Sequence, residues 1–201
     1  MKMSKLLICN FLLLMFFWNT SYAFVLLTEE QALQEMLTEV DEIVTETRIA
    51  SPEELTVMKE KMGGRLVLFQ KGSKAKELAA ITEFTFYFGI KDGKKVSVAI
   101  IEKQPGKWGP IEYIVALDME GKIQNLAVMS YVEKRGKPIA KRLFLKQFIG
   151  KSSKDKFKVK KDIRAISGAT ISSRSACFAV KKVTVLYEEL YLKVLVSSKQ
   201  E

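Results

Sequence analysis

Residues 84–102 read Phe-Thr-Phe-Tyr-Phe-Gly-Ile-Lys-Asp-Gly-Lys-Lys-Val-Ser-Val-Ala-Ile-Ile-Glu, and this stretch decides the fold. Apolar side chains stand at every second position from Phe84 to Ile90, which is the period of a strand with one buried face. The Asp-Gly pair at 92–93 is a strong turn signal, and residues 96–102 form a second apolar run. The stretch therefore predicts a β-hairpin.

The same pattern occurs once more downstream. Residues 111–117 alternate, Glu120-Gly121 supplies a turn, and residues 123–132 return. Two such hairpins predict an antiparallel sheet with one buried face. Residues 138–149 predict a helix that ends at Gly150, and a further helix is expected to begin near Ile171. The apolar stripe of this last helix predicts that it packs on the sheet.

Upstream of the hairpins the sequence predicts two helices. A capping box from Thr28 to Gln31 opens a helical apolar pattern, which predicts a helix over residues 29–46. Ser51-Pro52 begins a second, short helix that stops at Gly63-Gly64. Residues 66–69 form a short apolar run and predict a strand. The fold class is therefore α+β: an antiparallel sheet packed against a C-terminal helix, with an N-terminal helical pair.

Residues 1–23 have the three parts of a secretory signal peptide. Two lysines precede an apolar run from Leu6 to Trp18, and Ser21-Tyr22-Ala23 places small residues before the expected cleavage point. The apolar run is short for a bilayer span, which needs about 20 residues. We expect cleavage after Ala23, with retention as a membrane anchor as the alternative. The protein is then periplasmic or otherwise extracytoplasmic.

Composition excludes several kinds of function. The chain has no histidine, so a Ser-His-Asp site, a His-ligated zinc and a haem attachment motif are all excluded. Only Cys177 lies beyond the signal peptide, so no internal disulfide is expected. The net charge of +10 suits phosphate-bearing cofactors, anionic membrane surfaces or acidic proteins. Nucleic acid is not an expected partner of an exported protein.

Two basic and polar segments lie near the C-terminal helix. Residues 151–161 carry six lysines, which predict either a solvated loop or a docking surface for an acidic partner. Residues 167–173 read Ser-Gly-Ala-Thr-Ile-Ser-Ser, immediately before the helical pattern. Helix N-termini present N–H groups to anions, so this segment predicts a phosphate site. The phosphate could form an ester with a hydroxyl of the segment, above all that of Thr170.

With this segment in its context, residues 80–195 resemble the FMN-binding domain proteins, a family that includes periplasmic flavin subunits of sodium-pumping and Rnf-type oxidoreductases. The resemblance is carried by Gly136–Ile139, by Phe144–Phe148 and by Asp162–Ser173, in that order. The likeness is greatest to small stand-alone exported members. It implies an FMN-binding domain over residues 80–197, preceded by an N-terminal segment at 24–79.

The resemblance implies that Thr170 carries FMN as a phosphoester, installed by a separate flavin transferase with FAD as donor. A threonine hydroxyl needs a base for activation, and a reaction catalysed in trans suits a chain without histidine. The implied cofactor-binding set includes Ser167, Gly168 and Ala169 in the loop, and the N–H groups of Ser172 and Ser173 for the phosphate. The family commonly has an acid where this chain has Arg164. Asp162 could substitute for it, or Arg164 could contact the phosphate.

Three further residues are candidate neighbours of the flavin. Trp108, in a Gly/Pro loop, is expected either to cover the isoalloxazine ring or to anchor the loop. Tyr131 and Glu133 end a strand and either line the flavin cleft or serve only the sheet. We expect no metal ligands and no catalytic residues in this set.

The favoured hypothesis is an exported electron carrier that exchanges electrons with a membrane redox complex or a haem protein, because FMN accepts one or two electrons. One alternative is a non-redox binding or assembly module of the same fold. Another is an enzyme that uses noncovalent FMN to reduce a small molecule. Whether the chain is an enzyme therefore stays open, with an electron carrier favoured.

Overall fold

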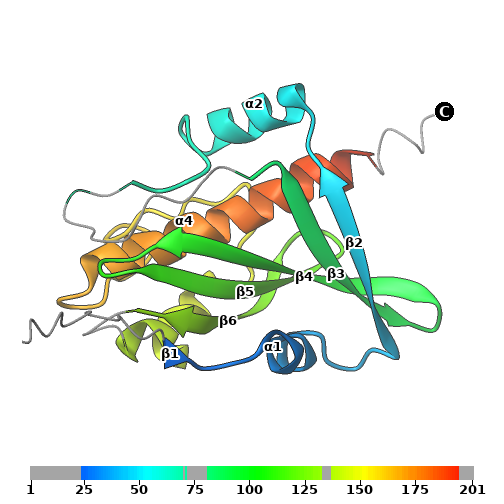
Figure 1. Cartoon of the computed structure of the whole chain (residues 1–201), viewed down its shortest axis with the longest axis horizontal. Coiled ribbons are helices and arrows are strands. Elements are labelled where there is room, and N and C mark those ends of the chain that lie inside the picture. Colours follow the sequence, from blue (N-terminus) through cyan, green and yellow to red (C-terminus); the bar gives the residue numbers. More distant parts are fainter. Residues whose placement is uncertain (1–23, 70, 72–80, 133–136, 195–201) are drawn as a thin grey trace, which may run out of the picture.

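The computed structural model describes residues 24–69, 71, 81–132 and 137–194 (Figure 1). The expected signal peptide and Glu133 lie outside the described residues. Within the part that the structure describes, none of the helices has the length and hydropathy that crossing a bilayer requires.

The centre of the fold is a six-stranded antiparallel sheet in the order β1-β6-β5-β4-β3-β2. The strands are β1 Phe24–Val25, β2 Glu42–Ile49, β3 Glu83–Lys91, β4 Lys94–Pro105, β5 Pro110–Asp118 and β6 Ile123–Tyr131. Both predicted hairpins are present. In the first, Lys91 pairs with Lys94 around Asp92 and Gly93, whose positive φ values of 50° and 70° match the twist of a hairpin turn.

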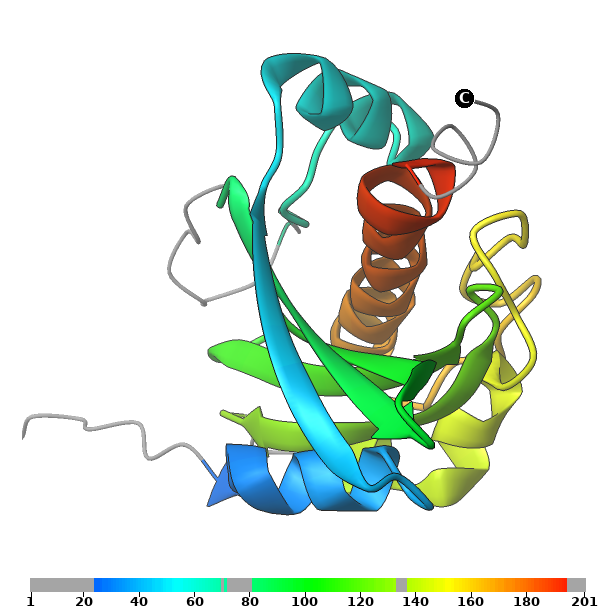
Figure 2. The same ribbon diagram turned by 90° about the vertical axis from the view of Figure 1, so that its right-hand side faces the viewer.

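Helices cover both faces of this sheet (Figure 2). The long helix α4, Thr170–Tyr187, crosses one face against β4 and β5, and a π-helical turn, Glu188–Leu192, continues it. The short helix α1, Glu29–Met36, lies on the opposite face against β5 and β6. The fold class α+β is thus confirmed. The expectation that only one sheet face is buried is wrong for the central strands. Because helices cover both faces, β5 is buried without a break from Tyr113 to Leu117.

The N-terminal region differs from prediction in one element. The capping box at Thr28 begins α1 as expected, but the helix ends at Met36 instead of reaching residue 46. Residues 42–49 form β2 and pair with β3, from Glu42 opposite Ile90 to Ile49 opposite Glu83. Segment 42–49 is rich in β-branched residues, and pairing with an open sheet edge prevails over its weak helical periodicity. The second predicted helix is confirmed as α2, Pro52–Lys61.

Two further segments also differ from prediction. Residues 66–69 form no strand. Leu66 is buried, and the Leu68 N–H donates to Gln104 Oε1 at 2.9 Å, so a side chain replaces a strand partner. Residues 138–149 break into a 3₁₀ turn Lys137–Ala140, the short helix α3 Arg142–Leu145 and a 3₁₀ turn Lys146–Phe148. The break comes at Lys141, whose backbone is extended at φ −71° and ψ 132°.

Candidate functional site

The loop that precedes α4 places Thr170 at the first residue of the helix. Gly168 has a φ of 73°, a left-handed conformation that side-chain-bearing residues rarely adopt, and Ala169 stands at the N-cap without a side-chain hydrogen bond. Thr170 is half-buried. First-turn N–H groups have no acceptor within their own helix, and the helix dipole adds positive potential there. The Thr170 hydroxyl therefore lies where an anion is stabilised.

Ser173 has a different role from the one that we expected. Its N–H donates to the carbonyl of Ala169 at 2.9 Å, so this group is not available to a phosphate. Its buried hydroxyl also donates to Ala169 O at 2.9 Å and accepts from the Ile166 N–H at 3.1 Å. Ser173 thus fixes the shape of the loop. Ser172 is buried beside it in the first turn of the helix.

Thr170 faces a polar cavity of about 720 Å³, which we call the motif cleft. Its lining includes the loop residues Ser167 and Gly168. Three cationic side chains and one carboxylate complete the charged part of the lining: Lys160, Lys161, Arg164 and Asp162. The excess of positive charge suits an anionic ligand, and Arg164 is exposed in this lining.

Asp162 has a structural role in the wall of the motif cleft. Its carboxylate accepts from the Lys158 N–H at 2.9 Å, and its own N–H donates to Lys158 O at 2.8 Å. Val159 and Ile163 form an isolated bridge across the same turn. Asp162 therefore holds the turn that carries Lys160 and Lys161 toward the cleft.

An apolar groove of about 490 Å³ adjoins the motif cleft. The two cavities share four lining residues: Gln147, Arg164, Ala165 and Ile166. The groove adds Phe144 and Leu143, and the Leu143 side chain is 73% exposed. A polar cavity that continues into an apolar one suits a ligand with an anionic end and a ring system.

Gln147 joins the segment 142–148 to the loop before α4. Its Oε1 accepts from the Arg164 N–H at 2.8 Å. Its Nε2 donates to Arg164 O at 3.3 Å and to Phe144 O at 3.1 Å. Gln147 lies within the segment Phe144–Phe148 that carries the family resemblance, but no role was expected for it. The signal that could have found it is an amide side chain in a segment with three apolar residues, Phe144, Leu145 and Phe148. Lys160, Lys161 and Leu143 were also missed.

The structure does not bring Trp108 or Tyr131 to either cavity. Trp108 lies in the turn closed by the Gly106 N–H and Gly109 O at 2.7 Å, with the Lys107 ammonium 5.4 Å from its ring. Tyr131 is buried and stacks on Phe24 at 5.6 Å between ring centroids. These positions fit the alternatives in which Trp108 anchors its loop and Tyr131 serves only the sheet. Glu133 lies outside the described residues.

Comparisons with known proteins agree with this geometry. Residues 106–185 match the sequence profile of the FMN-binding domain family, a span that contains the motif cleft and the apolar groove. No curated protein sequence matches the chain. Among solved structures, the chain is similar to NqrC from Shewanella oneidensis, with a TM-score of 0.52 and 16% sequence identity over 78% of this chain and 85% of that one. At that identity the likeness shows the fold alone.

Proposed function

We propose that this protein, whose FMN-binding domain spans residues 106–185, carries FMN as a phosphoester on Thr170 and transfers electrons outside the cytoplasm. The observation that carries the proposal is the position of Thr170. Its hydroxyl stands at the N-terminus of α4 and lines a cleft with three cationic side chains. FMN is the cofactor that the family match indicates.

The residues present fit the cofactor. A phosphodiester carries one negative charge, and the lining of the motif cleft supplies three cationic side chains, Lys160, Lys161 and Arg164, against one carboxylate, Asp162. The adjoining apolar groove would hold the isoalloxazine ring against Leu143, Phe144 and Ile166. When bound, FMN supplies one- and two-electron chemistry. The chain itself would position the ring and limit the access of water to it.

Attachment would use a transferase, because a threonine hydroxyl is a weak nucleophile and the carboxylate in the cleft lining, Asp162, is engaged by the Lys158 N–H. The Thr170 oxygen would form a bond to the FMN phosphorus of FAD, the pyrophosphate bond would break, and AMP would leave. The hydroxyl proton would pass to a base of the transferase. Covalent attachment suits an exported protein, because a freely exchanging FMN would be lost outside the cytoplasm.

In-gel fluorescence after denaturation tests the proposal. The chain is co-expressed with a flavin transferase, unfolded, and examined for a flavin-fluorescent band. We expect the band in the native chain and in the control variant Thr56→Ala, which alters an exposed threonine hydroxyl on α2, away from both cavities. We expect no band in Thr170→Ala, because the acceptor oxygen is gone.

The other outcomes separate the alternatives. Flavin that is released on denaturation would indicate the noncovalent reductase. No flavin before or after denaturation would indicate the non-redox binding module. A band that survives in Thr170→Ala would show that the acceptor is another residue.

A further inference from the structure

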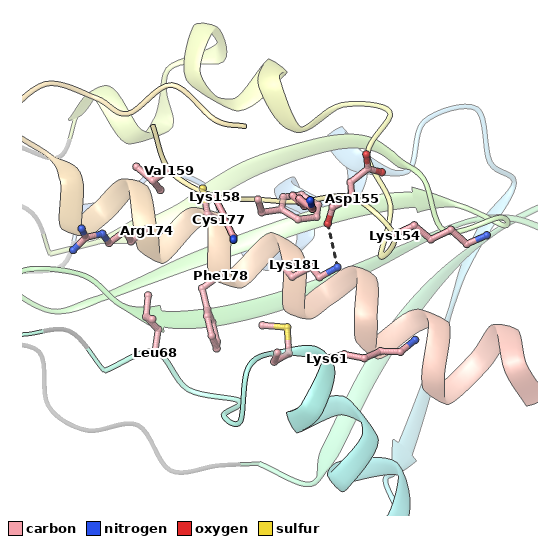
Figure 3. Close-up of a pocket in the computed structure, with 13 residues that line it drawn as sticks. Lys61, Leu68, Lys154, Asp155, Lys158, Val159, Arg174, Cys177, Phe178 and Lys181 are labelled. Atoms are coloured by element: carbon pink, nitrogen blue, oxygen red, sulfur yellow. Dashed lines mark hydrogen bonds between the residues drawn. The ribbon is translucent and has the colours of Figure 1, made fainter. Parts of the chain in front are cut away.

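A third cavity, of about 600 Å³, runs along α4 (Figure 3). We call it the α4 cleft. Arg174, Cys177, Phe178 and Lys181 line it from α4, at the spacing that places side chains on one helical face. Residues 154–159 form one wall, and the C-terminal end of α2 with Leu68 forms the other.

The α4 cleft is separate from the two cavities at the FMN motif. It shares no lining residue with the motif cleft or with the apolar groove. The tight turn from Lys158 to Ile163 stands between them, closed by the hydrogen bond from the Lys160 N–H to Ile163 O at 2.8 Å. The proposed flavin site therefore does not account for this cavity.

The inner surface of the α4 cleft is apolar. Its apolar lining consists of Met62, Leu68, Phe157, Val159, Cys177 and Phe178. Phe157, from the wall 154–159, and Phe178, from α4, both line the cleft, so a flat ring system that fills it could contact both aromatic side chains. Burial raises the pKa of the Cys177 thiol to about 12, so it stays protonated and behaves as part of this apolar surface.

The rim of the α4 cleft is cationic. It carries six basic side chains: Lys61, Lys154, Lys156, Lys158, Lys181 and Arg174. Lys61 is paired with Glu188 at 2.8 Å, and Lys181 donates to backbone carbonyls of Ser153 and Asp155. Among the described residues, no ion pair engages the side chains of the other four.

Asp155 is the one acidic side chain in this lining and offsets only part of the charge of the six basic side chains. Its carboxylate accepts from the Ser152 N–H at 2.9 Å and from the Ser152 hydroxyl at 3.1 Å. Burial lowers the pKa of Lys181, whose ammonium stands 5.6 Å from the centroid of the Phe157 ring. An anion that entered the cleft would meet a partly desolvated cation beside an aromatic face, where charge interactions are stronger than in bulk water.

We propose that the α4 cleft binds a free small-molecule anion with an aromatic body, the ring system against Phe157 and Phe178 and a carboxylate, sulfonate or phosphate at the rim. The volume lies within the range of about 300–1,000 Å³ that is typical of small-molecule sites. An apolar body without charge would leave the rim cations without a partner. A small inorganic anion would leave the apolar floor in contact with water.

Equilibrium dialysis with a matched pair of probes tests this. The anion is anilinonaphthalenesulfonate, and phenylnaphthylamine is its uncharged analogue. We expect the FMN-loaded protein to bind the anion more tightly than the analogue. The double variant Lys158→Gln/Arg174→Gln should weaken binding of the anion by roughly tenfold at low ionic strength and leave the analogue unchanged. The control Lys59→Gln/Lys94→Gln alters exposed lysines elsewhere and should change neither affinity.

A second variant tests the apolar floor. Phe178→Ala should weaken both probes, because it removes ring contacts that the two probes share. Equal affinity of the two probes, or an unchanged anion affinity in Lys158→Gln/Arg174→Gln, would overturn the proposal. So would loss of the anion site on covalent loading with FMN, since that result would make the α4 cleft part of the flavin site. The Thr170→Ala chain provides the FMN-free comparison.

Discussion

At the scale of single residues, the candidate site depends on a few polar side chains that hold backbone in place. Thr170 offers the acceptor hydroxyl, while Ser173 and Gln147 satisfy backbone groups of the loop before α4. Ser173 is buried and lines neither the motif cleft nor the apolar groove, whereas Gln147 lines both of them. Their effect is to fix the positions of Thr170 and Arg164. A loop that is held at both ends loses less conformational entropy when its ligand binds, so these hydrogen bonds should favour binding.

Replacement of Gln147 by leucine tests this positioning role. Gln147→Leu removes the bonds to both backbone groups of Arg164, so we expect the free energy of unfolding to fall by about 1–2 kcal/mol. We also expect slower flavin attachment, because the loop that presents Thr170 is released. Denaturant unfolding measures the first effect, and the time course of flavin fluorescence during transferase treatment measures the second.

The matched control is Gln124→Leu, at an exposed position of β6. It should change the unfolding free energy by less than about 0.5 kcal/mol. Normal attachment kinetics in Gln147→Leu would show that the loop keeps its shape without this amide.

At the scale of elements, α4 is joined to the sheet by a buried ion pair. Lys182 Nζ lies 2.9 Å from Glu102 Oε1 on β4, and both side chains are 4% exposed. Gln104 Nε2 donates to the same carboxylate at 2.6 Å and to Leu66 O at 3.3 Å. This network fixes α4, β4 and the irregular segment after α2 relative to one another. Because a buried charge needs its partner, the network is sensitive to the loss of one member.

Lys182→Met should lower the free energy of unfolding by about 3–5 kcal/mol at neutral pH, since it leaves the Glu102 carboxylate buried without its cation. The double variant Lys182→Met/Glu102→Leu should recover most of this loss. Urea unfolding of both variants provides the comparison. A double variant as unstable as the single one would mean that packing, and not the unpaired charge, is the cause.

The pH dependence of Lys182→Met has a definite sign. Burial already raises the pKa of Glu102 above its ordinary value of 4.5, and removal of the Lys182 ammonium takes away the largest opposing effect. A folded-state pKa above the unfolded one means that the folded state binds more protons, so stability falls as pH rises. The destabilisation should therefore be smallest below pH 4.5 and grow toward neutral pH.

At the scale of the whole molecule, positive charge is concentrated around the candidate site. Residues 137–164 contain eleven basic residues and two acidic ones. The segment contributes to the lining of the motif cleft, the apolar groove and the α4 cleft. A one-sided charge distribution steers oppositely charged partners toward one face, which increases association rates at low ionic strength.

We therefore expect the reduced, FMN-loaded protein to react faster with an acidic c-type cytochrome than with a basic one at low salt. The variant Lys154→Glu/Lys156→Glu should slow the reaction with the acidic cytochrome by roughly tenfold at low ionic strength, and the difference should vanish at high salt. Stopped-flow absorbance measures the rates, with Lys59→Glu/Lys94→Glu as the control. Equal slowing in the control would assign the effect to net charge alone.

The sequence by itself determined the features that depend on local chemistry. The alternating stretch at Phe84–Ile90 with its Asp-Gly turn fixed a hairpin, the capping boxes at Thr28 and Ser51 fixed two helix starts, and the Ser-Gly-Ala-Thr loop marked the N-terminus of α4. These signals act between neighbours in the chain, so they do not require knowledge of distant contacts.

Tertiary structure decided what depends on partners far away in sequence. Residues 42–49 became a strand because the edge of β3 was available, and residues 66–69 did not because Gln104 took the place of a strand partner. The burial of both sheet faces and the Lys182–Glu102 ion pair between α4 and β4 likewise arise only when distant elements pack. The physical reason is that burial and charge proximity are properties of the folded surface, while local periodicity is a property of the chain.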